Sequence, residues 1–164
     1  MPRQKGFSLI ELLIVVAIIL VIAGIAIPNL LRPRMAANES SAVGSLRAIN
    51  SAETMYAVTY QANGFAATLA ALGPPSGGGS NASSTNAILL DGVLGCATQP
   101  CSKSGYRFSI TGGTPMSGVV YTYSSNADPI TPDQTGKRHF YSDPSGVIRY
   151  NGSVTASSTD TALQ

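Results

Sequence analysis

Charged side chains are scarce in this chain of 164 residues: Asp, Glu, Lys and Arg make up 11% of it, and tryptophan is absent. There is one histidine, His139, and there are two cysteines, Cys96 and Cys101. Zinc sites that combine several cysteines and histidines therefore have too few ligands. The sequence also lacks Gly-x-Ser-x-Gly and His-Glu-x-x-His motifs. We therefore expect neither an enzyme nor a bound cofactor.

The chain also lacks the charge excess typical of nucleic-acid binding proteins. Its formal net charge is +2, and Arg3 and Lys5 account for two of its ten cations. Without these two, eight basic residues face eight acidic ones. No basic stripe with interleaved aromatic residues is evident, so we expect no nucleic-acid partner.

A long apolar run from Phe7 to Ile27 dominates the N-terminus. Its length is close to the roughly 20 residues that a membrane-spanning helix needs, and no A-x-A-like cleavage site closes it. Arg3 and Lys5 before the run favour a cytoplasmic N-terminus. Glu11 interrupts the run at a cost of roughly 2–3 kcal/mol, and such residues usually mark function. Alternatively, Glu11 lies near the helix start and reaches the lipid headgroups.

These residues resemble the N-terminus of type IV pilins and of their relatives, the pseudopilins of type II secretion. The matching segment reads Lys5-Gly6-Phe7-Ser8-Leu9-Ile10-Glu11-Leu12, followed by Ile27-Pro28-Asn29. The resemblance implies that residues 1–6 are a leader, that prepilin peptidase cleaves after Gly6, and that the new amine of Phe7 is methylated. It also implies that Glu11 pairs with the Phe7 amine of an adjacent subunit in a helical filament.

The resemblance implies a set of partners and locations as well. The subunit waits in the inner membrane, meets an assembly platform, and polymerises with itself, with minor pilins and an outer-membrane secretin as further partners. We expect an extracellular pilus that supports adhesion or twitching motility. One alternative is a periplasmic pseudopilin, and another, from a different class, is a membrane-anchored binding or catalytic domain. Electron conduction is disfavoured because no aromatic residue lies between Phe7 and Tyr56.

The sequence predicts one long helix in two halves. Residues 7–28 form the apolar half, which is a transmembrane segment or a filament core, and residues 29–62 form an amphipathic half that packs on the head. Gly24, Pro28 and Pro33 predict kinks or local melting. The face expected to pack comprises Met35, Ala42, Val43, Leu46, Ile49, Tyr56 and Tyr60. The residues expected to lie mostly off it are Asn38, Glu39, Ser45, Arg47, Asn50 and Glu53.

Residues 63–164 are expected to form a small head, so that the fold class is α+β. A short helical turn at 65–72 precedes a flexible, linker-like loop at 73–86. Cys96 and Cys101 suggest a disulfide loop worth roughly 2 kcal/mol, with free thiols as the alternative. An antiparallel sheet of three or four strands is expected at about 104–151. The polar tail, 152–164, is expected to fray.

Alternating residues define the expected strands. In 104–111 the apolar positions are Tyr106, Phe108 and Ile110, and in 118–124 they are Val119, Tyr121 and Tyr123. Strands at 137–142 and 147–151 flank a turn at 143–146. His139 is expected on a sheet face. A calcium site formed by Asp128, Asp133 and Asp143 is a weaker alternative, because a proline adjoins each of them in the sequence and indicates turns.

Overall fold

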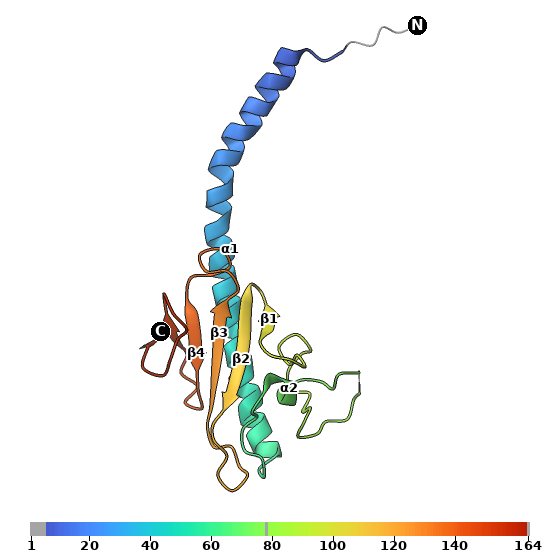
Figure 1. Cartoon of the computed structure of the whole chain (residues 1–164), viewed down its shortest axis with the longest axis vertical. Coiled ribbons are helices and arrows are strands. Elements are labelled where there is room, and N and C mark those ends of the chain that lie inside the picture. Colours follow the sequence, from blue (N-terminus) through green and yellow to red (C-terminus); the bar gives the residue numbers. More distant parts are fainter. Residues whose placement is uncertain (1–5, 78, 164) are drawn as a thin grey trace. The chain divides into compact units, whose positions relative to one another are not determined.

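The structure, a computed structural model, describes residues 6–77 and 79–163, and for residues 25–30 it describes the helical backbone without the side chains. The chain divides into two units, Met1–Arg34 and Met35–Gln164, and each is described by itself. Helix α1 (Leu9–Thr59) runs through both units, close to the predicted bounds. Figure 1 shows the trace of the chain.

The second unit combines the later part of α1 with a sheet, which confirms the predicted α+β class. The sheet has six strands rather than three or four, in the order in which they occur in the chain, and every neighbouring pair is antiparallel. Figure 1 shows β2, β3 and β4 side by side over the second half of α1. The remaining elements are α2 (Leu69–Leu72), β1 (Cys101–Lys103), β2 (Tyr106–Gly112), β3 (Tyr123–Pro129), β4 (His139–Ser142), β5 (Arg149–Asn151) and β6 (Thr161–Ala162).

The core lies between α1 and the inner face of the sheet. Leu46 and Ile49 of α1 are fully buried there, and so are Tyr106 and Phe108 of β2. The predicted alternation in β2 is confirmed, because its inward side chains are buried while those between them are exposed or half-buried. Burial of each large apolar side chain contributes roughly 1.5–3 kcal/mol. This contact fixes which face of the sheet is left for solvent.

The strand predicted at 118–124 is wrong in its first part. β3 begins only at Tyr123, Val120 is buried, and Tyr121 is 60% exposed. The N–H of Val120 donates to the carbonyl of Asn63 at 2.9 Å, and the N–H of Phe65 donates to the carbonyl of Val120 at 2.8 Å. The N–H and carbonyl of Val120 therefore hydrogen-bond to the loop after α1 and not to a neighbouring strand.

The polar tail, predicted to fray, instead extends the sheet. β6 pairs with β5, and Ala156 is buried. The carboxylate of Asp160 accepts hydrogen bonds from the N–H of Ser157 at 2.7 Å and from Nδ2 of Asn151 at 2.9 Å. Hydrogen bonds within the tail, together with those to β5 and to Asn126 of β3, thus order a segment that has little apolar surface. The predicted turn at 143–146 is confirmed by a hydrogen bond from the N–H of Gly146 to the carbonyl of Asp143 at 2.9 Å.

Two glutamates of α1 that were predicted to lie mostly off the packing face are buried. Glu39 is 8% exposed and Glu53 is fully buried, so this prediction is wrong for both. The reason is that loops, and not only strands, cover the helix. Glu39 accepts from the N–H groups of Lys137 and Arg138 and from the Arg138 side chain at 2.7 Å. Burial opposes ionisation of Glu39, but these donors together lower its pKa.

Glu53 is buried with less compensation. Its Oε2 accepts from the N–H of Ala66 at 2.8 Å, while its Oε1 has no hydrogen-bond partner in the part of the chain that the structure describes. Burial raises the pKa of Glu53 from 4.5 to about 8, and the Ala66 N–H offsets only part of this. The carboxyl is therefore protonated at neutral pH.

We expect the free energy of unfolding to fall as the pH rises from about 4.5 to about 8. In this window the unfolded chain loses the Glu53 proton and the folded chain keeps it, so each pH unit costs up to about 1.4 kcal/mol. Glu53→Gln has no proton to lose and flattens this slope. Urea unfolding across this pH range, monitored by circular dichroism, measures the effect.

Glu39→Gln is the matched control for this experiment. The pKa of Glu39 is lowered, so its stabilising contribution is present above the unfolded-state pKa and is lost only in more acidic solution. The slope between pH 5 and 8 therefore persists in Glu39→Gln. An unchanged slope in Glu53→Gln contradicts a protonated Glu53 in the folded chain.

The predicted disulfide between Cys96 and Cys101 is confirmed, with a Cα–Cα distance of 5.7 Å. Cys101 opens β1 and is buried. Inside the loop, the Gln99 amide donates from Nε2 to the carbonyl of Ile110 at 2.7 Å, and its Oε1 accepts from the N–H of Ile110 at 3.2 Å. The disulfide therefore holds a side chain that binds the backbone of β2.

The Cys96→Ser, Cys101→Ser double variant is expected to unfold at lower denaturant concentration, with a loss of about 2 kcal/mol. The reason is that a short loop regains its freedom in the unfolded chain, which disfavours folding. Denaturant titration of oxidised wild type, reduced wild type and the variant compares all three. Equal midpoints for oxidised and reduced wild type contradict this expectation.

Candidate functional site

The segment singled out by the sequence ends in the first turn of α1. The N–H of Ser8, the residue before the helix, donates to Oε2 of Glu11 at 2.9 Å, and the N–H of Leu12 donates to the Ser8 carbonyl at 3.2 Å. This is one half of a capping box, in which a carboxylate at the third helical position binds the N–H of the capping residue. The reading that Glu11 lies near the helix start is thus supported.

The capping contact uses one oxygen of the carboxylate. The other oxygen of Glu11 has no hydrogen-bond partner among residues 6–77 and 79–163. A carboxylate in the first turn also interacts favourably with the positive end of the helix dipole. Glu11 therefore presents a negative charge close to the point where Gly6 meets Phe7.

Gly6 and Phe7 lie before the helix and are exposed, Phe7 by 88%. A Cβ placed on Gly6 meets no atom within 4 Å. No contact in the described part of the chain therefore requires glycine at this position. If glycine is required at this position, the requirement comes from another molecule that binds the segment.

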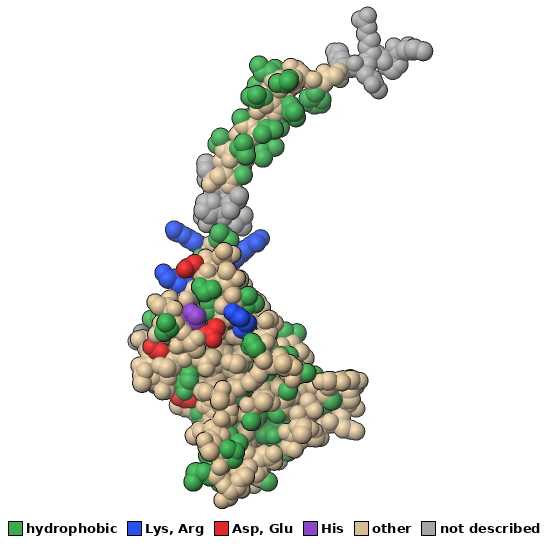
Figure 2. Space-filling model, in the orientation of Figure 1, with side chains coloured by type: hydrophobic (Ala, Val, Ile, Leu, Met, Phe, Trp, Pro, Cys, Tyr) green, Lys and Arg blue, Asp and Glu red, His purple; other side chains and the backbone are tan. Residues whose placement is uncertain are grey.

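The apolar side chains that follow are exposed within the first unit. The large ones between Phe7 and Ile22 are 47–88% exposed, and Figure 2 shows them as a hydrophobic surface. A contiguous surface of this kind usually marks contact with a membrane or another protein. Glu11 is the one charged residue between Phe7 and Ile27.

Among the residues that the structure describes, no helix is both long and apolar enough to cross a bilayer.

The positions predicted to kink or melt lie inside a continuous helix. α1 passes through Gly24, Pro28 and Pro33 without a break, and a Cβ at Gly24 meets no atom within 4 Å. The side chain of Pro28 lies outside the described residues. Local melting therefore stays a prediction.

Two of the three acidic residues considered for calcium bind other groups of the chain. Asp128 binds His139 and Asp143 accepts from the N–H of Ser145 at 2.9 Å. The described residues contain no group of three His, Cys, Asp or Glu side chains able to hold a metal ion.

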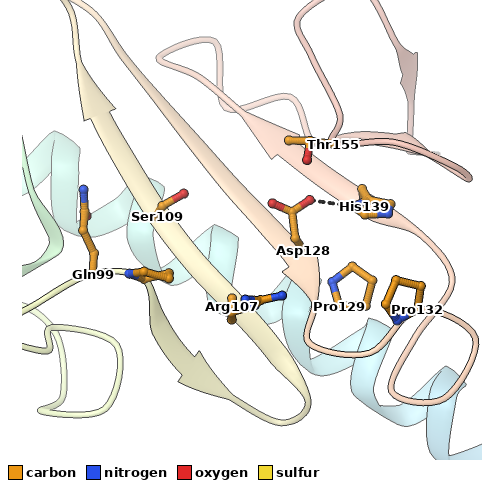
Figure 3. Close-up of a pocket in the computed structure, with 9 residues that line it drawn as sticks. Gln99, Arg107, Ser109, Asp128, Pro129, Pro132, His139 and Thr155 are labelled. Atoms are coloured by element: carbon orange, nitrogen blue, oxygen red, sulfur yellow. Dashed lines mark hydrogen bonds and ion pairs between the residues drawn. The ribbon is translucent and has the colours of Figure 1, made fainter.

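The sequence did not reveal a hollow on the outer face of the sheet, which Figure 3 shows around Arg107, Asp128 and His139. His139 lies on this sheet face, as predicted. The alternation along each strand indicates which residues face outward. The strand register that brings these three together is known only from the structure.

The model of the prokaryotic N-terminal methylation motif matches residues 1–27. The chain is 46% identical over 55 residues to the type IV major pilin protein PilA of Myxococcus xanthus, which is 34% of this chain and 25% of that protein. It is 45% identical over 58 residues to the type IV wide pilus major component PilA4 of Thermus thermophilus, which is 35% of this chain and 44% of that protein.

A component of type II secretion is similar too. The chain is 38% identical over 56 residues to the type II secretion system core protein G of Klebsiella pneumoniae, which is 34% of this chain and 40% of that protein. The matches thus span from a quarter to less than half of these relatives. No solved structure matches the chain. These findings confirm the resemblance to the type IV pilin and pseudopilin superfamily and support a pilin-family structural subunit, and none of the relatives is named as an enzyme.

Proposed function

We propose that this chain, whose N-terminus carries the methylation motif of the type IV pilin and pseudopilin superfamily, is a structural subunit of a type IV pilus. Prepilin peptidase cleaves it after Gly6 and methylates Phe7, and the subunit then polymerises through α1. The observation that carries the proposal is the capped helix start, in which Glu11 and an exposed apolar surface follow directly on the cleavage segment.

The exposed apolar half of α1 explains both stages of this life cycle. Before assembly the inner membrane covers its side chains, and after assembly the helices of neighbouring subunits cover them. Transfer of these side chains from the membrane to the filament changes their free energy little, because both surroundings are apolar. Contacts between helices can therefore decide whether the subunit stays in the membrane or assembles. An assembly platform, minor pilins and an outer-membrane secretin are proposed as the machinery.

Cleavage after Gly6 creates the positive partner that Glu11 needs in an apolar environment. The new amine at Phe7 is one residue from Ser8, whose N–H already binds Glu11. In this proposal, the second carboxylate oxygen of Glu11 accepts a hydrogen bond from the Phe7 amine of an adjacent subunit. A buried charge that lacks its partner is strongly destabilising, so this pairing also sets the axial position of each subunit.

A pseudopilin of type II secretion is the second candidate function. Protein G relatives support it, at 35–38% identity, while the two pilus components named above are 45–46% identical. The higher identities favour the pilus. Abundant fibres in material sheared from cells support an adhesive or motile pilus, and a short periplasmic polymer that requires secretion genes supports the pseudopilin.

Gly6→Val is expected to abolish processing, because a branched side chain replaces the glycine that the peptidase reads. Intact-mass analysis is expected to show wild-type filament protein that begins at a methylated Phe7, whereas the variant keeps Met1 and stays in the membrane. Gly44→Ala is the matched control, since Gly44 is an exposed helical glycine with open space around it. Wild-type filament protein that retains Met1 contradicts the proposal.

Glu11→Leu and Glu11→Gln together separate charge from helix capping. Glutamine still accepts from the Ser8 N–H but cannot pair with an amine as an ion, and leucine does neither. We expect both variants to insert normally and to lower the yield of sheared filaments at least about tenfold, because about 1.4 kcal/mol per contact already changes association tenfold. Normal filaments from Glu11→Gln refute the pairing and leave capping as the role of Glu11.

A further inference from the structure

The outer face of the sheet carries a hollow of about 530 Å³ that the proposed filament role does not use. Its walls come from β2, β3 and β4 and from loops beside them, all within the second unit (Figure 3). The volume falls in the range of roughly 300–1,000 Å³ that is usual for ligand sites. The lining combines polar and charged side chains with proline rings, and these side chains indicate the chemistry of a ligand.

Three ionisable residues form a row across the floor of the hollow. Arg107 on β2 pairs with Asp128 on β3. The register in which Ala127 pairs with Phe140 places His139 of β4 opposite Asp128. Residues that lie directly opposite on adjacent strands have side chains on the same face. Because strands support all three, their positions are fixed more firmly than loop residues would be.

Asp128 holds His139 in one orientation. Nδ1 of His139 lies 2.5 Å from Oδ1 of Asp128, and the two side chains are 12% and 29% exposed. An ionised carboxylate only accepts hydrogen bonds, so the imidazole proton of this contact is on Nδ1. Nε2 of His139 and Oδ2 of Asp128 have no hydrogen-bond partner within residues 6–77 and 79–163. Both are available to a ligand.

Arg107 brings the positive charge. One of its guanidinium nitrogens donates to the carbonyl of Ile130 at 3.4 Å, a long contact. It forms no ion pair with any described residue, although Asp128 is its strand partner. A guanidinium has five N–H donors in a planar fork that suits a carboxylate. Most of this binding capacity is therefore unused.

Hydroxyl groups and proline rings complete the walls. Ser109 lies beside Arg107 on the β2 side and Thr155 lies on the other side, as Figure 3 shows. Neither hydroxyl has a hydrogen-bond partner among the described residues. Pro129 and Pro132 add apolar surface. The hollow thus offers a fork of donors, an anionic acceptor, an imidazole and two hydroxyls.

We propose that this hollow binds an acidic sugar, a uronic acid residue of a polysaccharide. The carboxylate of the sugar binds Arg107, its hydroxyls donate to Oδ2 of Asp128 and contact His139, and the proline rings pack on its ring. The negative charge of Asp128 beside Arg107 disfavours a multiply charged anion such as phosphate. A hydroxyl group, in contrast, donates to that carboxylate, so a sugar ring that carries one carboxylate and several hydroxyl groups fits best.

The test uses the full chain in detergent micelles, so that it does not depend on filament formation. Trigalacturonate is the probe, and maltotriose and inorganic phosphate are the comparison ligands. His139 is the one histidine of the chain, so its imidazole NMR signals report on this site alone. Saturable shifts of these signals with trigalacturonate, and at least tenfold weaker effects with both comparison ligands, support the proposal.

Variants decide how the ligand is held. Arg107→Gln is expected to weaken trigalacturonate binding at least tenfold, while Arg47→Gln, which removes an exposed charge from α1, has no effect. Asp128→Asn is expected to weaken binding as well. Equal loss in Arg47→Gln, tighter binding in Asp128→Asn, or phosphate binding as strong as that of trigalacturonate each overturns the proposal. Thermal melting temperatures equal to wild type show that the variants are folded.

In the proposed filament, this site recurs on every subunit. Weak sites repeated along one polymer bind a polymeric ligand with an avidity well above that of a single site. This step rests on the proposed function, whereas the micelle experiment does not. Binding in micelles without filaments in cells therefore supports the site and counts against the pilus.

Discussion

Burial of one side of α1 against both strands and loops is the constraint on which the head depends. Two glutamates about four helical turns apart carry this contact to segments that are distant in the sequence. Glu39 binds the backbone that leads into β4, and Glu53 binds the backbone before α2. Apolar packing alone is not directional. A buried carboxyl without hydrogen-bond donors is costly, so these segments are restricted to the few positions in which their N–H groups reach it.

The same helix meets two different requirements along its length. In the head, α1 packs against the sheet and loops of the same chain, which bury its apolar side chains. Before the head its large apolar side chains are exposed, and their partners have to be other molecules. Glu11 stands in the first turn of the exposed part, where capping satisfies half of the carboxylate. Donors within the chain bind Glu39 in the head, whereas in the proposed filament the amine of an adjacent subunit binds Glu11.

The parts of this fold that the sequence predicted are those set by neighbouring residues. The alternation of β2, the turn at 143–146 and the short disulfide loop depend on local chemistry, and all three are confirmed. The start of β3 and the ordered tail depend on hydrogen bonds to distant segments, which periodicity does not report. The burial of Glu53 was missed for the same reason, because its polar character predicts exposure until Ala66 is known to donate to it.

The scarcity of charge makes the remaining charged groups informative. Most acidic side chains in the described residues already bind a donor of the chain, as Glu39, Asp91, Asp128 and Asp160 do. A head with few charges has little bulk attraction for ions, so recognition has to come from local groups. Figure 2 shows a mostly uncharged polar surface on the visible side of the head. In the proposed site, recognition comes from the Arg107 guanidinium, which has no ion pair among the described residues, and from the Asp128–His139 pair beside it.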